Sequence, residues 1–224
     1  IDIKGSGTVG VITYLRTDST RISAEADANA REYIAQNYGE NYVSAVAKKA
    51  DDGKKIQDAH EAIRPTDITS TPATLKDSLT RDQFRLYQLI WKRFAASRMN
   101  PAKYETTSIK IAAGEYRFSV AASKNVFEGF RAVYVEADEE KEDNNVLVKS
   151  IDKDSKLTKE ELEPKQHFTQ PPAHYTEASL VKTMEELGIG RPSTYAPTFT
   201  TIISRRYVAK ENKNLYVTEL GEVV

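Results

Sequence analysis

Cysteine is absent from the 224 residues, which excludes disulfide bonds, thiolate catalysis and cysteine-based zinc sites. Histidine is scarce, and the three histidines, His60, His167 and His174, show no metal-ligand spacing. No apolar run is long enough to cross a bilayer, and 39% hydrophobic with 29% charged residues is the composition of a soluble globular protein. These absences leave a soluble protein of one large or two modest domains whose chemistry uses no thiolate.

Net charge is also nearly absent, at −1, but the charged residues are unevenly distributed. Residues 138–164 hold ten acidic residues and five lysines, a net charge of −5, so the rest of the chain carries +4. A surplus this small is far from the basic footprint of a histone. The charge therefore permits a nucleic-acid partner without requiring one.

The N-terminal part predicts a strand, a helix and a further helical turn. Residues 8–15 (TVGVITYL) form a short β-branched apolar run, which is typical of a buried strand. Ser23 is a suitable N-cap for an alanine-rich helix over 24–38, and Gly39 follows that helix. Residues 60–64 predict one helical turn that Pro65 ends.

The middle of the chain changes from helical to alternating periodicity. Thr80 and Gln83 make a capping box, and the helix after them has an apolar face made of Phe84, Tyr87, Ile90, Trp91 and Phe94. From 105 to 136 apolar residues recur at alternate positions, including the run 132–135. Gly114 and Gly129 separate these runs. We therefore expect antiparallel sheet after the helical part.

The C-terminal part predicts helix, turn, helix and hairpin. Thr176 caps a helix through about Leu187, and Pro192 opens another through about Arg206. Two short apolar segments then flank 211–214. This order is that of a winged helix, which binds nucleic acid in many proteins and serves protein contacts in others. The chain as a whole is predicted to be α+β.

Tyr14 and Arg16 are the first candidates for chemistry. In an extended segment positions i and i+2 share a face, so these two side chains would point the same way. A fixed guanidinium beside a phenol favours the phenolate and can bind a phosphate bidentately. The pair suits attack by a tyrosine on a phosphodiester. The alternative is structural, a tyrosine that ends a core strand beside a surface arginine.

Two further places suit an anion. On a helical turn His60 and Arg64, at i and i+4, would converge on one phosphate; otherwise His60 is a solvent-facing residue before a proline. The second place is the start of the two C-terminal helices, where N–H groups lie beside polar side chains. Those side chains belong to Thr176, Ser179, Arg191, Ser193 and Thr194. The alternative there is an ordinary capped helix–helix turn.

Three segments closely resemble motifs of type IA DNA topoisomerases. Residues 10–20 (GVITYLRTDST) resemble the active-site tyrosine motif, 59–65 (AHEAIRP) the second motif and 188–196 (GIGRPSTYA) the third. The three stand in the family's order, and the resemblance covers essentially the whole chain. The third motif is more similar to bacterial topoisomerase I or reverse gyrase than to topoisomerase III.

The resemblance implies a nucleophile and its neighbours. Tyr14 would form a transient 5′-phosphotyrosyl bond with one DNA strand, and resealing after strand passage would relax negative supercoils without ATP. Arg16 would position the scissile phosphate, and His60 would hydrogen-bond beside it. The DNA-binding residues expected in addition are Arg64, Thr176, Ser179, Arg191, Ser193 and Thr194.

The resemblance also implies an organisation and partners. Residues 1–100 would form a helical, winged-helix-like tyrosine domain, 101–170 part of an antiparallel β arch, and 171–224 part of a helical, winged-helix-like DNA-groove domain. Magnesium is implied for the full-length enzyme, held by a Toprim domain, with no metal ligand in this chain. The implied partner is single-stranded or negatively supercoiled DNA, with no membrane. The full-length enzyme would be a monomer in the bacterial cytoplasm, at the nucleoid.

No Toprim acidic cluster lies within the 224 residues, so we expect the chain to be a fragment. Alone, it would bind single strands weakly and relax supercoils negligibly. The rival interpretation, from another class, is a winged-helix module that binds single-stranded nucleic acid with no covalent step. The two interpretations differ in whether a covalent protein–DNA adduct forms.

Overall fold

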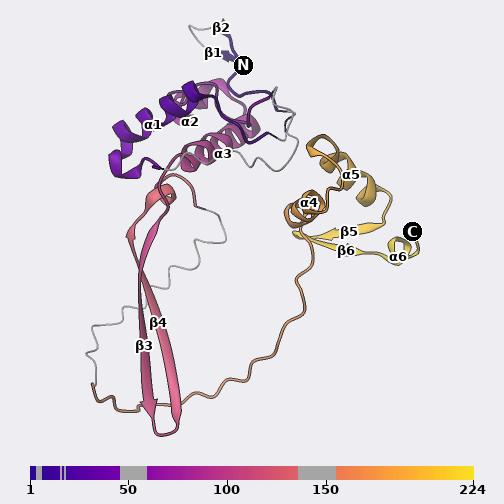
Figure 1. Cartoon of the computed structure of the whole chain (residues 1–224). Coiled ribbons are helices and arrows are strands. Elements are labelled where there is room, and N and C mark those ends of the chain that lie inside the picture. Colours follow the sequence, from indigo (N-terminus) through magenta and orange to yellow (C-terminus); the bar gives the residue numbers. More distant parts are fainter. Residues whose placement is uncertain (4–6, 16, 18, 46–59, 136–154) are drawn as a thin grey trace. The chain divides into compact units, whose positions relative to one another are not determined.

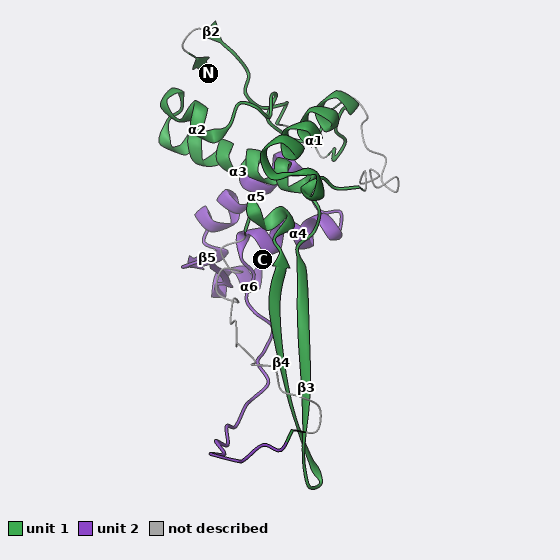
Figure 2. Ribbon diagram, turned by 90° about the vertical axis from the view of Figure 1, so that its left-hand side faces the viewer, with its two compact units in different colours: residues 1–155 green, residues 156–224 purple. Residues whose placement is uncertain are grey.

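The computed structural model describes residues 1–3, 7–15, 17, 19–45, 60–135 and 155–224. The chain divides into two compact units, Ile1–Ser155 and Lys156–Val224, which Figure 2 colours separately. Most of the acidic stretch at 138–164 and the polar loop at 48–57 lie outside the described residues.

Helices form the folded body of the first unit (Figure 1). They are α1 (Ala24–Tyr38), α2 (Pro72–Leu75) and α3 (Arg81–Ser97), with 3-10 turns η1 (Glu40–Tyr42) and η2 (Lys76–Ser78). Ser23 caps α1 by accepting the Ala26 N–H at 3.3 Å, and Gly39 ends it at a φ of 109°. Thr80 and Gln83 form the capping box of α3. The two long helices predicted from the sequence are confirmed.

The core of this unit lies between α1, α2 and α3. Trp91 packs edge-on to Tyr33, with ring centroids 5.8 Å apart, and its Nε1–H donates to the Ile68 carbonyl at 2.9 Å. The predicted apolar face of α3 is confirmed, since Tyr87, Trp91 and Phe94 are buried. The buried apolar residues of the cluster are Ala30, Ile34, Ile68, Leu75, Tyr87, Trp91, Phe94, Ala95, Met99 and Val133.

A long hairpin follows the helices, made of β3 (Lys103–Ala113) and β4 (Tyr116–Phe127) (Figure 1). The strands pair antiparallel in a register that sets Ile109 opposite Val120 and Ile111 opposite Phe118. Gly114 makes the tight turn with a φ of 62°. The antiparallel sheet expected here is confirmed for this hairpin.

The prediction of a strand over 132–135 is wrong. After β4 the chain forms a 3-10 turn, η3 (Gly129–Ala132), whose Phe130 N–H donates to the Asn100 carbonyl at 2.9 Å. Gly129 adopts a φ of 53°, and a Cβ there would collide with the backbone of Asn100 and Pro101. Val133 from this run is buried in the helical core. Burial there outweighs the alternating apolar pattern that predicted a strand.

The prediction of a strand over 8–15 is also wrong. Strand β1 (Asp2–Ile3) pairs with β2 (Gly7–Thr8) in a small antiparallel ribbon. Beyond it, Ile12 makes a single bridge to Pro65, and Leu15 is 63% exposed. A short apolar run does not itself specify a partner strand, and among the described residues a sustained partner does not form.

The second unit contains α4 (Glu177–Glu186), α5 (Pro192–Ser204), β5 (Val208–Glu211), β6 (Asn214–Val217) and α6 (Glu219–Val223). Strands β5 and β6 pair antiparallel through a turn at Asn212, whose φ is 56°. Phe199 and Leu215 are its buried apolar residues. The predicted helix, turn, helix and hairpin are confirmed, whereas α6 was not expected. Helices with small antiparallel sheets in both units make the chain α+β.

Within the part of the chain that the structure describes, no helix has the length and apolar character needed to span a bilayer.

Candidate functional site

Tyr14 lies at the surface of the first unit, in a segment that is neither helix nor strand and that bends at Leu15. Its side chain is 55% exposed. The neighbouring Arg16 lies outside the described residues, so its expected place on the same face as Tyr14 stays a prediction. A phosphodiester can reach an exposed phenol, whereas it could not reach a tyrosine that is buried inside a core strand. Tyr14 does not end a core strand, because the described residues around it form no such strand.

Hydrogen bonds join the Tyr14 segment to residues 62–66. The Thr66 N–H donates to the Val11 carbonyl at 3.1 Å, and the Thr13 N–H donates to the Arg64 carbonyl at 2.9 Å. A regular antiparallel pair would return the Arg64 N–H to the Thr13 carbonyl. That N–H instead donates to Thr13 Oγ1 at 2.9 Å. The backbone hydrogen-bond ladder therefore ends at Thr13, where a hydrogen bond to the Thr13 side chain replaces the next backbone bond.

His60 meets Tyr14 across this junction. The two rings are stacked, with centroids 4.8 Å apart and planes inclined by 24°. Neither residue lies in a helix or strand, so each is placed by the loop that carries it. The stack brings together a phenol and an imidazole, which are side chains of the kinds that serve as oxygen nucleophile and proton carrier in enzymes.

The prediction of a helical turn over 60–64 is wrong, so the i and i+4 geometry that would direct His60 and Arg64 to one phosphate does not form. Residues 60–65 are not helical. The Arg64 side chain is 12% exposed, pairs with Glu61 Oε2 at 2.7 Å from Nη2, and donates from Nη1 to the Pro65 carbonyl at 2.9 Å. Proline disfavours the helical conformation in the residue before it, and backbone pairing with 11–13 holds the segment in a non-helical conformation.

Hydroxyl groups also shape the chain after Tyr14. The Ser19 N–H donates to Thr17 Oγ1 at 3.0 Å, and the Arg21 N–H donates to Ser19 Oγ at 3.2 Å. Ser19 is buried, and the Arg21 carbonyl accepts the Ala62 N–H at 2.8 Å. The chain is thus tied to the His60 segment on both sides of Tyr14.

The candidate residues of the second unit lie at two helix starts. The Thr176 hydroxyl accepts the Ser179 N–H at 3.1 Å, and the Ser179 hydroxyl accepts the Thr176 N–H at 2.8 Å, so they form the capping box of α4. At the start of α5, Thr194 Oγ1 accepts the Arg191 N–H at 2.8 Å. Arg191 and Ser193 are exposed. The structure thus brings Thr176 to Ser179 and Arg191 to Thr194.

Among the described residues, no group of three or more His, Cys, Asp or Glu side chains is placed to hold a metal ion.

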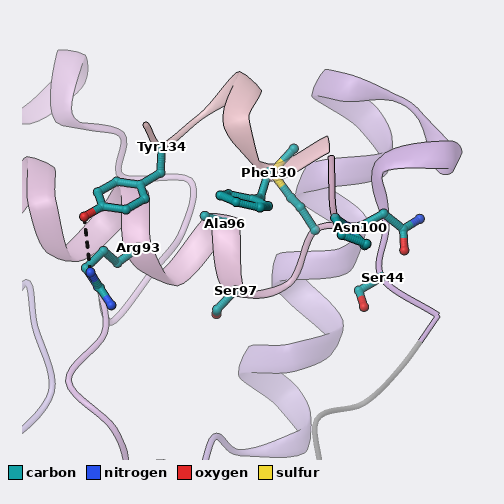
Figure 3. Close-up of a pocket in the computed structure, with 9 residues that line it drawn as sticks. Ser44, Arg93, Ala96, Ser97, Asn100, Phe130 and Tyr134 are labelled. Carbon is teal, nitrogen blue, oxygen red and sulfur yellow. Dashed lines mark hydrogen bonds between the residues drawn. The ribbon is translucent and has the colours of Figure 1, made fainter. Parts of the chain in front are cut away.

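A cavity of about 510 Å³ that the sequence did not indicate lies where α3 meets η3 (Figure 3). Arg93 Nη1 donates to Tyr134 Oη at 3.2 Å, and the guanidinium lies 5.3 Å from the Tyr134 ring centroid. Phe130, Ala96 and Asn100 line the same cavity. In the second unit, a groove of about 710 Å³ runs between α4 and α5, over Val181, Phe199 and Ile203.

The chain belongs to the DNA topoisomerase family, which it matches over residues 7–224. A solved structure to which it is similar is full-length topoisomerase I from Thermotoga maritima, at 39% identity and a TM-score of 0.73. The match covers 97% of this chain and 34% of that one, so the chain spans about a third of that enzyme's length. These comparisons confirm the family resemblance.

Proposed function

We propose that Tyr14 is the nucleophile with which a type IA topoisomerase cuts and rejoins one DNA strand. The observation that carries this proposal is the exposed Tyr14 phenol stacked on the His60 imidazole, in a chain that belongs to the topoisomerase family. An accessible oxygen nucleophile beside a proton carrier is what transesterification of a phosphodiester requires.

The reaction exchanges one phosphodiester for another. The Tyr14 oxygen attacks phosphorus, a new P–O bond joins the DNA 5′ phosphate to Tyr14, and the P–O bond to the 3′ oxygen breaks. The phenol loses a proton and the departing 3′ oxygen gains one. Rejoining is the reverse step. Because the number of phosphodiester bonds is unchanged, relaxation of negative supercoils needs no ATP.

The other site residues take supporting roles in this proposal. His60 hydrogen-bonds a phosphate oxygen or exchanges a proton near Tyr14. Arg16 positions the scissile phosphate. Arg64 stays a predicted DNA contact, although its guanidinium is engaged by Glu61 and Pro65 in the free chain. Arg191, Ser193 and Thr194, with Thr176 and Ser179, hold the single strand.

Magnesium belongs to the proposal only for the complete protein. The described residues provide no cluster of carboxylate and imidazole ligands, so they do not fit a site for the ion and no step is derived through it. We further propose that the complete protein binds single-stranded or negatively supercoiled DNA, involves no membrane, and acts as a monomer in the bacterial cytoplasm. The 224-residue chain, about a third of its relative's length, is proposed to be inactive in relaxation by itself.

A suicide oligonucleotide, incubated with the complete protein that carries this chain, tests the nucleophile. We expect a covalent adduct on a denaturing gel, and we expect Tyr14→Phe to abolish it because the phenol oxygen is gone. Tyr116→Phe, at a tyrosine that is 75% exposed in β4, is the matched control and should form the adduct at the unaltered rate.

The same experiment decides the rival function. The order α4, α5, β5 and β6 supports a winged-helix module that binds single-stranded nucleic acid without a covalent step. Binding without any adduct in the unaltered protein would favour that module. An adduct that survives Tyr14→Phe would disprove the assignment of Tyr14.

A further inference from the structure

We propose that Thr13 is a positioning residue for the cleavage reaction, because its hydroxyl holds the Tyr14 segment against the segment that carries His60. This inference rests on the proposed role of Tyr14 and adds a residue to that site. The Thr13 side chain is distinct from the reacting groups, and it acts through the placement of its neighbour.

The Thr13 hydroxyl makes two bonds to a distant part of the chain. It donates to the Ala62 carbonyl at 2.8 Å, across a separation of 49 residues. It accepts the Arg64 N–H at 2.9 Å, across 51 residues. One side chain therefore uses both its donor and its acceptor to join the residue before Tyr14 to the residues just after His60.

These bonds matter for Tyr14 because little else near the junction is regular. The backbone pair at Ile12 and Pro65 is a single bridge, and the Arg64 N–H goes to the Thr13 hydroxyl instead of continuing the ladder. More than half of the Tyr14 side chain is exposed, so its position depends on the backbone that carries it. The Tyr14 and His60 rings, whose centroids are 4.8 Å apart, belong to the two segments that the Thr13 hydroxyl joins.

Thr66 provides a matched comparison on the same junction. Its hydroxyl donates to the Gly10 carbonyl at 2.9 Å and so joins the same two segments. Gly10 is four positions from Tyr14, whereas Thr13 is adjacent to it. Loss of the Thr66 hydroxyl removes one bond of the junction but leaves the Thr13 bonds next to the nucleophile.

The test measures single-turnover adduct formation on the suicide oligonucleotide, together with affinity for an uncleaved oligonucleotide. The complete protein is compared as wild type, Thr13→Val, Thr13→Ser and Thr66→Val. Valine keeps the shape of threonine but removes the donor and the acceptor. We expect Thr13→Val to slow adduct formation about tenfold to a hundredfold, the usual effect of a small misplacement of a reacting group. DNA affinity should change by less than about twofold, since the loss is confined to the chemical step.

Thr13→Ser restores the hydroxyl and should return the rate to near the wild-type value, and Thr66→Val should also cleave at near that value. Thermal unfolding shows whether each variant is folded, and Thr13→Ala replaces Thr13→Val if the latter is not. A Thr13→Val protein that cleaves at the wild-type rate would overturn the proposal, as would a slow Thr13→Ser protein. An adduct that persists in Tyr14→Phe would instead overturn the proposed function, so the two failures are distinguishable.

Discussion

Tyr87 lies on α3 with its ring in the core, and its hydroxyl donates to the Ser70 carbonyl at 2.5 Å. Burial, with a further contribution from the charge of Asp67, raises the pKa of Tyr87 from 10.0 to about 12. The folded state therefore holds the phenol protonated at pH values where the unfolded chain would ionise it. This stabilising contribution is complete below pH 10 and is lost as the pH rises through about 12.

We expect Tyr87→Phe to lower the free energy of unfolding at neutral pH by about 1 kcal/mol, because the Ser70 carbonyl loses its donor. The difference between wild type and variant should shrink between pH 10 and 12, where only the wild type has this phenol to ionise. Urea unfolding of the chain at a series of pH values measures both effects. A difference that stays constant across that range would contradict the assignment.

At the same scale, the sequence motifs single out candidate residues but do not specify which neighbours each of them meets in the fold. Tyr14 and His60 were selected from short motifs, and the structure places their rings together. The helical turn that would bring His60 and Arg64 together does not form, and Arg64 pairs with Glu61 instead. Thr13 carried no signal of its own, since its hydroxyl partners lie 49 and 51 residues away.

At the scale of elements, one carboxylate links the two long helices of the first unit. Asp27 in α1 accepts from Arg31 at 2.6 Å and from Arg98, just beyond α3, at 2.9 Å. Burial by itself would raise the pKa of Asp27, but hydrogen bonds and charge from Arg31 and Arg98 outweigh it and lower the pKa below 3.8. The contribution to stability is therefore present above the pKa of the unfolded chain and is lost as the pH falls through the folded value.

Asp27→Asn should lower the free energy of unfolding by about 1–2 kcal/mol at neutral pH, because both arginines lose a charged acceptor. The difference from wild type should disappear in acid, once Asp27 is protonated in both states. Glu32→Gln, at an exposed position of the same helix, is the control and should have little effect. Urea unfolding at neutral and acidic pH tests this, and an effect of equal size at both would refute the ionic explanation.

The elements that the sequence predicted well are those specified by neighbouring residues. The caps at Ser23, Thr80 and Thr176 and the turn at Gly114 act within a few positions, and all are observed. The errors at 8–15, 60–64 and 132–135 fall where a distant contact decides the conformation. At each of these, burial or cross-chain hydrogen bonding outweighs a weak local preference.

For the whole molecule, the net charge of −1 is a sum in which exposed basic residues such as Arg191 are offset by acidic residues elsewhere in the chain. Arg191→Ala in the complete protein should weaken binding of a single-stranded oligonucleotide by about threefold to tenfold, and should reduce the salt dependence by about one phosphate contact. Arg191 is exposed at the start of α5, where backbone N–H groups add to its attraction for phosphate.

Fluorescence anisotropy at several salt concentrations measures this effect. Lys182→Ala, which removes an exposed charge from the body of α4, is the control and should change both affinity and salt slope less. Equal losses in the two variants would show that Arg191 contributes only general charge.

The sequence by itself determined the family motifs, the exclusion of thiolate chemistry, the caps and the alternation of the β3–β4 hairpin, because each depends on residue type or on neighbours in the chain. Only the tertiary structure decided that Tyr14 is exposed, that it stacks on His60, and that the Thr13 hydroxyl replaces a backbone acceptor. Those contacts join segments about 50 residues apart, and they form only when the whole unit packs. No local pattern encodes them, which is why the link between Thr13 and the segment after His60 became visible only in the fold.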